Sequence, residues 1–255
     1  MNGRAAIEIQ MSDREIPSPG ALVRDAYRKV EAEREALFRI AAIPAALQFL
    51  IITLLHPEDP AEPAMFIASI LNLIPATMFD VAWLRRLLGA DEGDPLLPYR
   101  WGRRQMGYLI RFALLILLLV FPVMFIAIMA GQILGNAVAI IMVAGAIGGF
   151  YVFLRLSMIL VAQALGRPCD PRMSWSATQA GAFRMFWGAA FVSLPVLLIG
   201  MTLIAIADTS GLALRFPLLT TLALVVLGLV LRALFLAVVA QVYAICMTGI
   251  DRMGR

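Results

Sequence analysis

The chain contains little cysteine, little histidine and little charge. Its 255 residues include two cysteines, Cys169 and Cys246, and one histidine, His56. A His/Cys zinc site needs four ligands close together, so we predict no metal site. The orientation argued below puts both thiols on or near the cytoplasmic side. That is a reducing environment, so we expect both thiols to stay free.

Charged residues are 15% of the sequence and hydrophobic residues 62%, whereas soluble domains average about 25% charged and about 45–50% apolar. From Phe112 to Leu154 the chain has no Asp, Glu, Lys or Arg. A helix needs only about 20 apolar residues to cross a bilayer. This composition excludes a soluble protein and predicts an all-α, polytopic membrane protein.

Six apolar stretches predict six transmembrane helices. The connections after the first, third and fifth stretches are short, which pairs the helices into three hairpins. Four stretches contain a proline, which a membrane helix tolerates as a kink. The stretches cover about 38–55, 64–84, 110–130 and 185–206, two longer ones begin near 133 and 213, and the prolines are Pro44, Pro75, Pro122 and Pro195.

Basic residues alternate between the two sides of this map. Segments 1–39, 85–111 and 155–184 contain seven, six and four Lys or Arg, whereas the connections 56–63 and 131–136 contain none. Cytoplasmic loops carry the excess of Lys and Arg in membrane proteins. We therefore predict that both termini face the cytoplasm. The net charge of +4 follows from this topology, so we predict no nucleic-acid partner.

A segment mixing aromatic and basic residues precedes each hairpin, which predicts amphipathic helices at the cytoplasmic membrane surface. The first has Ser18 as a helix cap and Pro19 at the first helical position. The second and third are 99–108 and 174–187. The chain thus divides into a disordered N-terminus at 1–17, an amphipathic helix at 18–37 and a six-span membrane domain at 38–255.

Asp80 is the only carboxylate inside a predicted span. An acid within a membrane is costly, so it either pairs with a cation or marks an ion path. We expect a structural pair with one of the arginines that lie in or beside the other spans. A transport role for Asp80 is the alternative. The candidate partners are Arg111, Arg155 and Arg232.

Two of these arginines lie in stretches that are too long for a bilayer. Residues 133–165 and 217–249 are each 33 residues, roughly 50 Å of helix, whereas the hydrocarbon core is about 30 Å thick. The simplest interpretation puts Arg155 and Arg232 near the inner interface, with the helices continuing beyond it to pack on each other and on the amphipathic helices. The rival interpretation is that the helices tilt and that an arginine is buried in the membrane as a functional charge. Of the two arginines, Arg232 suits this interpretation better.

Gly145 and Gly149 form a Gly-x-x-x-Gly spacing in an apolar helix. Small residues let membrane helices approach closely, so both glycines are candidates for helix packing within the chain, and homodimerisation is the alternative. No zinc-protease, nucleophile-elbow or phosphate-loop motif occurs. We therefore predict that the chain is not an enzyme and holds no cofactor.

One stretch carries a family resemblance. Arg155–Ser157, Ala164–Pro168, Trp175–Thr178 and Phe183–Trp187 resemble bacterial six-span inner-membrane proteins of the YciC type, and the membrane domain attached to some glycerophosphodiester phosphodiesterases. The chain departs from their pattern at Gln179–Gly181, where the family has an Arg-Gly-Asn-type run. The resemblance implies a multi-pass protein of the bacterial inner membrane without an assigned reaction.

The functional expectation follows from these observations. We predict a non-catalytic accessory or scaffold subunit, associated with membrane lipids and with either a protein partner or further copies of itself. A small oligomeric transporter or channel is the alternative, and it requires polar groups at mid-membrane. The main mid-span polar residues are few: Asn72, Ser193 and Thr202.

Overall fold

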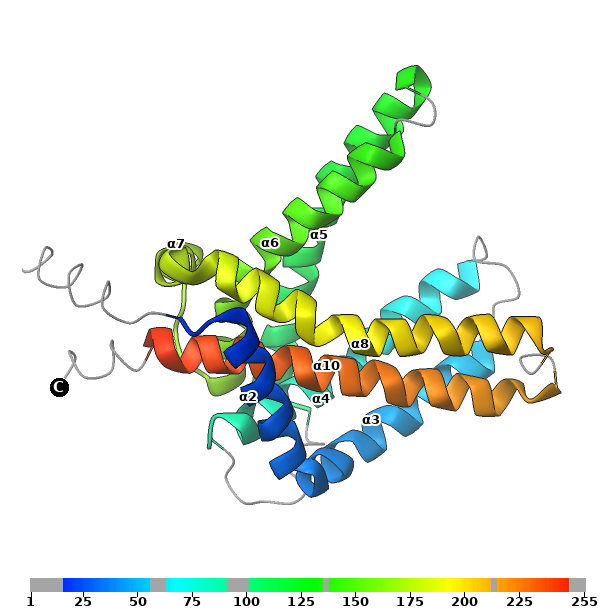
Figure 1. Cartoon of the computed structure of the whole chain (residues 1–255), viewed down its shortest axis with the longest axis horizontal. Coiled ribbons are helices and arrows are strands. Elements are labelled where there is room, and N and C mark those ends of the chain that lie inside the picture. Colours follow the sequence, from blue (N-terminus) through cyan, green and yellow to red (C-terminus); the bar gives the residue numbers. More distant parts are fainter. Residues whose placement is uncertain (1–15, 56–62, 91–100, 135–137, 212–214, 248–255) are drawn as a thin grey trace, which may run out of the picture.

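The computed structural model describes residues 16–55, 63–90, 101–134, 138–211 and 215–247. All regular secondary structure in these residues is helical, and six helices are long and apolar enough to cross a membrane (Figure 1). The predicted all-α, six-span architecture is confirmed. The helices are α2 (Pro19–Ala32), α3 (Arg34–Leu55), α4 (Pro63–Leu87), α5 (Arg103–Leu134), α6 (Val138–Leu165), α7 (Pro171–Ala177), the 3₁₀ turn η3 (Gln179–Gly181), α8 (Ala182–Thr209) and α10 (Pro217–Met247).

The six spans form three hairpins, because α3 packs extensively on α4, α5 on α6 and α8 on α10. Helices α3, α4, α5 and α8 each continue through their internal proline, as expected where neighbouring helices supply packing. Cys169 and Cys246 are free thiols. Residues 1–15 of the N-terminus predicted to be disordered over 1–17, and residues 56–62 of the first connection, which include His56, lie outside the described part of the chain.

The hairpin of α5 and α6 diverges from the other two. Figure 1 shows it leaving the bundle at a wide angle, while α3, α4, α8 and α10 run side by side. The hairpins stay together at one end, where α2, α7 and the C-terminal half of α10 lie. We call this end the base, and we call the opposite end, where α3 and α8 end and α4 and α10 begin, the turn end.

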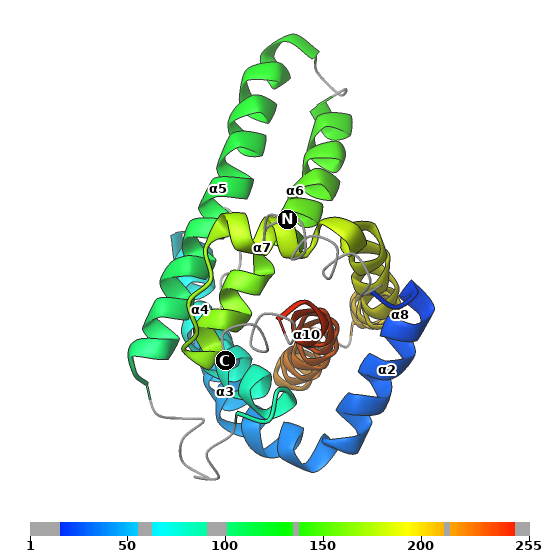
Figure 2. The same cartoon turned by 90° about the vertical axis from the view of Figure 1, so that its left-hand side faces the viewer.

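The core of the protein lies in the base. The segment of α10 from Ala233 to Met247 is largely buried, and Figure 2 shows it surrounded by α2, α3, α4, α6 and α8. The C-terminal half of α6, from Leu154 to Ala164, is buried in the same way. Both helices therefore remain apolar past their arginines because protein covers them there, and this agrees with the simpler interpretation of their length.

Helix α2 lies across α8 and α10. Ser18 caps it and Pro19 begins it, as predicted, and its apolar face buries Leu22 and Ala26 completely. Leu22 packs on Gly188 of α8, where an added Cβ would come within 3.0 Å of the leucine side chain. The absence of a side chain at position 188 therefore allows the two helices to approach closely.

The N-terminal segment predicted to be disordered through residue 17 is ordered earlier than that. Ile16 is 4% exposed, and its side chain occupies the space that a Cβ on Gly181 would need. Its carbonyl oxygen accepts a hydrogen bond of 2.7 Å from Arg184 Nη1. A buried apolar side chain and a hydrogen-bonded carbonyl therefore fix Ile16, and neither contact is visible in the composition of the segment.

The predicted amphipathic segments also need correction. The first ends at Glu33, where α3 begins directly afterwards. The described part of the second, 99–108, belongs mostly to α5, which starts at Arg103 as one continuous helix. The third is split among α7, η3 and α8, with Asp170 capping α7 by accepting from the Met173 N–H at 2.6 Å. Continuous hydrogen bonding into the span is less costly than a break at the interface, which explains the second case.

The contact between Gly188 and Leu22 gives a test of the docking of α2. Gly188→Leu overpacks this contact, which costs about 1–3 kcal/mol. Because proteolysis follows the population of the opened state, trypsin should cleave at Arg24, Arg28 and Lys29 about tenfold faster than in the unchanged protein. Gly148→Leu is the matched control, since a Cβ at Gly148 meets no atom within 4 Å. Equal cleavage rates for the two variants would contradict this packing.

Candidate functional site

Asp80 of α4 pairs with Arg232 of α10. The carboxylate accepts hydrogen bonds from Arg232 Nε at Oδ1 and from Arg232 Nη2 at Oδ2, the latter at 2.7 Å. Tyr108 of α5 donates its hydroxyl to Oδ2 at 2.9 Å. The Asp80 side chain is 2% exposed and that of Arg232 is 29% exposed. Three donors therefore satisfy a buried carboxylate, and each comes from outside its own helix.

A second contact fixes the same two helices. Trp83 follows Asp80 by three residues, so the two side chains share one face of α4. The Trp83 indole is fully buried and donates Nε1–H to the carbonyl oxygen of Ala233 at 3.1 Å. Asp80 and Trp83 thus bind adjacent residues of α10. This pair of contacts sets the position of α4 along α10.

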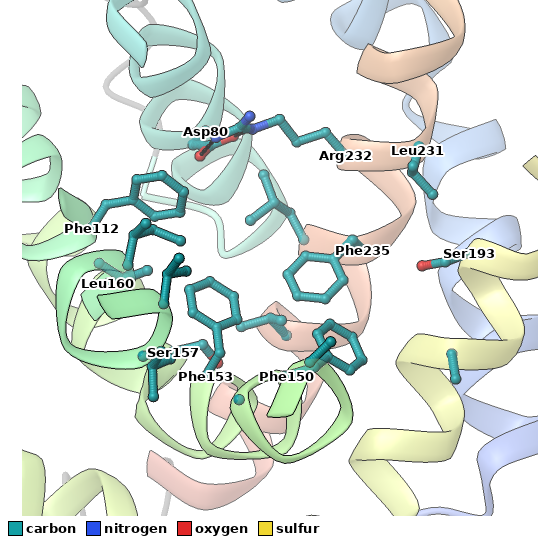
Figure 3. Close-up of a pocket in the computed structure, with 18 of the residues that line it drawn as sticks. Asp80, Phe112, Phe150, Phe153, Ser157, Leu160, Ser193, Leu231, Arg232 and Phe235 are labelled. Atoms are coloured by element: carbon teal, nitrogen blue, oxygen red, sulfur yellow. Dashed lines mark hydrogen bonds and ion pairs between the residues drawn. The ribbon is translucent and has the colours of Figure 1, made fainter. Parts of the chain in front are cut away.

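Beside the ion pair lies a cleft of about 890 Å³ between the diverging hairpin and the rest of the bundle. Residues of α4, α5, α6, α8 and α10 line it, and most are aliphatic or aromatic. Figure 3 shows Asp80 and Arg232 meeting at one side, with the ring of Phe112 beside them and the rings of Phe153 and Phe235 farther along the cleft. The hydroxyls of Ser157 and Ser193 also line the cleft but donate to carbonyls of their own helices.

Aromatic rings connect the walls of this cleft. Phe153 of α6 contacts Phe112 of α5 edge to face at 6.1 Å between centroids, and it stacks on Phe235 of α10 at 6.3 Å. Phe150 contacts Phe235 at 6.1 Å. Such pairs contribute about 0.5–1.5 kcal/mol each beyond burial. They hold the hairpin of α5 and α6 against α10 at the base and leave it free to diverge towards the turn end.

Arg155 does not pair with Asp80. It is 7% exposed, its guanidinium carbon lies 3.6 Å from the Trp175 ring centroid, and it donates to the Trp175 carbonyl at 2.5 Å and to Thr178 Oγ1 at 3.3 Å. Ser174 Oγ donates back to the Arg155 carbonyl at 2.6 Å. Arg155 therefore fastens α7 to α6. Helix α7 covers Arg155, whereas Arg232 borders a cleft and pairs with Asp80.

Arg111 is the third arginine proposed as a partner of Asp80, and it also lies elsewhere. It is half-buried on α5, and its Nη1 is buried without a hydrogen-bond partner. Cys169 lies in the connection before α7. Burial and the neighbouring Asp170 raise the pKa of its thiol above the ordinary value, and the charge of Arg111 offsets only part of this rise. The raised pKa disfavours the reactive thiolate.

The two glycines of the Gly-x-x-x-Gly spacing differ. A Cβ on Gly145 would overlap the side chain of Val123 on α5, so this glycine permits the close packing of α5 on α6. Around Gly149 a Cβ would meet nothing within 4 Å, and Gly149 lines the cleft. The assignment of Gly149 to helix packing within the chain is therefore wrong. The divergence of the hairpin turns this position towards the cleft.

Sequence reasoning missed Tyr108 as a member of the site. The aromatic and basic composition around it assigned it to the membrane surface. Its spacing offers a signal, because Tyr108 and Phe112 are four residues apart and stack at 6.3 Å between centroids, on the face of α5 that meets Asp80 and Arg232. Within the described residues, no group of three or more His, Cys, Asp or Glu side chains comes together.

Comparison of the chain with family models, curated proteins and solved structures found no match. The resemblance to the YciC type therefore stays a prediction.

The ion pair predicts an unequal response to single and double substitutions. Asp80→Asn leaves the guanidinium of Arg232 without its counter-charge, and breaking a buried pair costs about 3–5 kcal/mol. The melting temperature in detergent and the folded yield should both fall. The double variant Asp80→Leu with Arg232→Met should recover most of the loss, because apolar replacement of a whole pair is often neutral. A double variant as unstable as Asp80→Asn would refute this account.

Proposed function

We propose that this chain is a non-catalytic, multi-pass protein of the bacterial inner membrane that binds a membrane lipid in the cleft and serves as an accessory or scaffold component. The observation that carries the proposal is a cleft of about 890 Å³ with apolar walls and a neutral ion pair at one side. Such a space matches a molecule with hydrocarbon tails and a hydrogen-bonding head.

The position of the cleft supports a lipid over a soluble ligand. It lies between helices that each have the length and hydropathy of a membrane span, and two of these helices, α5 and α6, diverge from the rest of the bundle (Figure 1). An acyl chain can enter from the bilayer without crossing water. The aromatic contacts between α5, α6 and α10 hold the walls of the cleft together towards the base.

Filling the cleft tests this proposal. Gly149→Phe should place a ring in the cleft without a clash, since a Cβ there meets open space. A ring that excludes about ten carbon contacts of an acyl chain weakens the binding free energy of the lipid by roughly 1–2 kcal/mol. This corresponds to about tenfold in affinity. Native mass spectrometry of the purified protein should therefore detect about tenfold less retained phospholipid.

Gly148→Phe is the matched control for this measurement. Its neighbourhood is equally open, and it lies outside the cleft lining. It should retain as much lipid as the unchanged protein. Equal lipid retention by all three proteins would contradict the lipid site.

A transporter is the second candidate, and one observation favours it. A smaller space of about 400 Å³ lies between α3, α4 and α10 and includes polar side chains: Gln48, Ser69, Asn72, Thr221 and Arg232. Polar groups at mid-membrane are typical of solute sites. If the protein purifies alone and conducts a solute in liposomes, and Asp80→Asn keeps its yield but loses the flux, the transporter replaces the scaffold.

The orientation is tested by labelling single cysteines. In a background of Cys169→Ala and Cys246→Ala, Ser18→Cys marks the base and Thr209→Cys marks the turn end. In spheroplasts, an impermeant maleimide should label position 209 and should reach position 18 only after lysis, because basic segments stay in the cytoplasm. Labelling of position 18 before lysis would reverse the orientation.

A further inference from the structure

The smaller, polar space has its own chemistry. Its polar lining consists of two amides, Gln48 and Asn72, two hydroxyls, Ser69 and Thr221, and the guanidinium of Arg232. We call this space the polar groove. Thr221 and Arg232 are eleven positions apart on α10, which is about 16 Å of helix. The groove therefore extends from near the turn end to the ion pair.

The polar groove and the apolar cleft share part of one wall. Gly228 and Arg232 of α10 line both spaces, and they lie one helical turn apart on the same face. A Cβ at Gly228 would meet no atom within 4 Å. Helix α10 therefore carries no side chain at position 228, which borders both spaces, and Arg232 borders both one turn further along.

The charges around these two positions are balanced. Within the described residues, the hydrogen bonds of the Arg232 guanidinium go to Asp80 alone, from Nε and Nη2, so its Nη1–H groups can donate to a ligand. The other polar side chains of the groove are uncharged. An anionic head would bring a charge with no free counter-charge, which is costly in a membrane interior. An uncharged head with hydroxyl or carbonyl oxygens has no such penalty.

We infer that one uncharged amphiphile occupies both spaces, with its acyl tails in the cleft, its hydroxyl-bearing head in the polar groove and a head oxygen accepting from Arg232 Nη1. The ligand class is a neutral glycerolipid, such as a diacylglycerol. This inference rests on the proposed lipid site and adds to it the place of the head and the selection against charge.

The test uses the full-length protein in detergent and three lipids with identical dioleoyl chains. The lipids are dioleoylglycerol, dioleoylphosphatidylcholine and dioleoylphosphatidic acid, added together in equal amounts, and native mass spectrometry measures the retained fraction of each. We expect dioleoylglycerol to exceed phosphatidic acid about tenfold, which corresponds to about 1.4 kcal/mol. Equal retention of the three, or a preference for phosphatidic acid, would overturn the inference and leave the lipid cleft standing.

Gly228→Leu puts a side chain at the position that borders both spaces. The ratio of dioleoylglycerol to phosphatidic acid should then fall to about one, while some lipid is still retained. Gly148→Leu, a glycine in equally open space outside both linings, should keep the ratio.

If Gly228→Leu fails to fold, Gln48→Leu with Thr221→Val removes two head contacts and should lower the ratio. An unchanged ratio in the folded variant overturns the inference, and no retained lipid of any kind in the unchanged protein overturns the proposed function itself.

Discussion

The ion pair between Asp80 and Arg232 is the constraint on which the arrangement of the spans depends. Neither charge is tolerable alone inside a membrane, so α4 and α10 must meet at these two residues. Trp83 adds a bond to the next residue of α10, and Tyr108 brings in α5. Three helices from three different hairpins are thus tied together at one level, and the packing of the base follows from it.

This constraint explains why the protein is compact at one end and open at the other. On the base side of the ion pair, α2 and the C-terminal halves of α6 and α10 bury a continuous apolar core. Arg155 anchors α7 to this core. From the ion pair towards the turn end, no comparable polar contact among the described residues holds the hairpin of α5 and α6 to the other helices. Apolar side chains gain little by leaving lipid for protein, so nothing forces this hairpin to close against α8.

The sequence predicts those features that local rules determine. The six spans follow from hydropathy, the start of α2 from Ser18 and Pro19, and the need for an arginine beside Asp80 from the cost of a lone carboxylate. The choice among Arg111, Arg155 and Arg232 depends on the tilt and rotation of three helices, which no local pattern encodes. The cleft is equally inaccessible to sequence reasoning, because Phe150 or Phe235 in a cleft and a phenylalanine facing lipid have the same sequence environment.

In the lipid site that we propose, the balance of charge also limits which lipids the cleft selects. A lipid tail that moves from the bilayer into an apolar cleft exchanges one hydrocarbon environment for another, so the hydrophobic effect contributes little to its binding. Any preference among lipids with the same tails must therefore arise where polar groups meet. Because Asp80 already compensates Arg232, the remaining N–H groups of this arginine favour an acceptor without a full negative charge. In the lipid site that we propose, the same pair that positions the helices also determines which head groups can be accommodated.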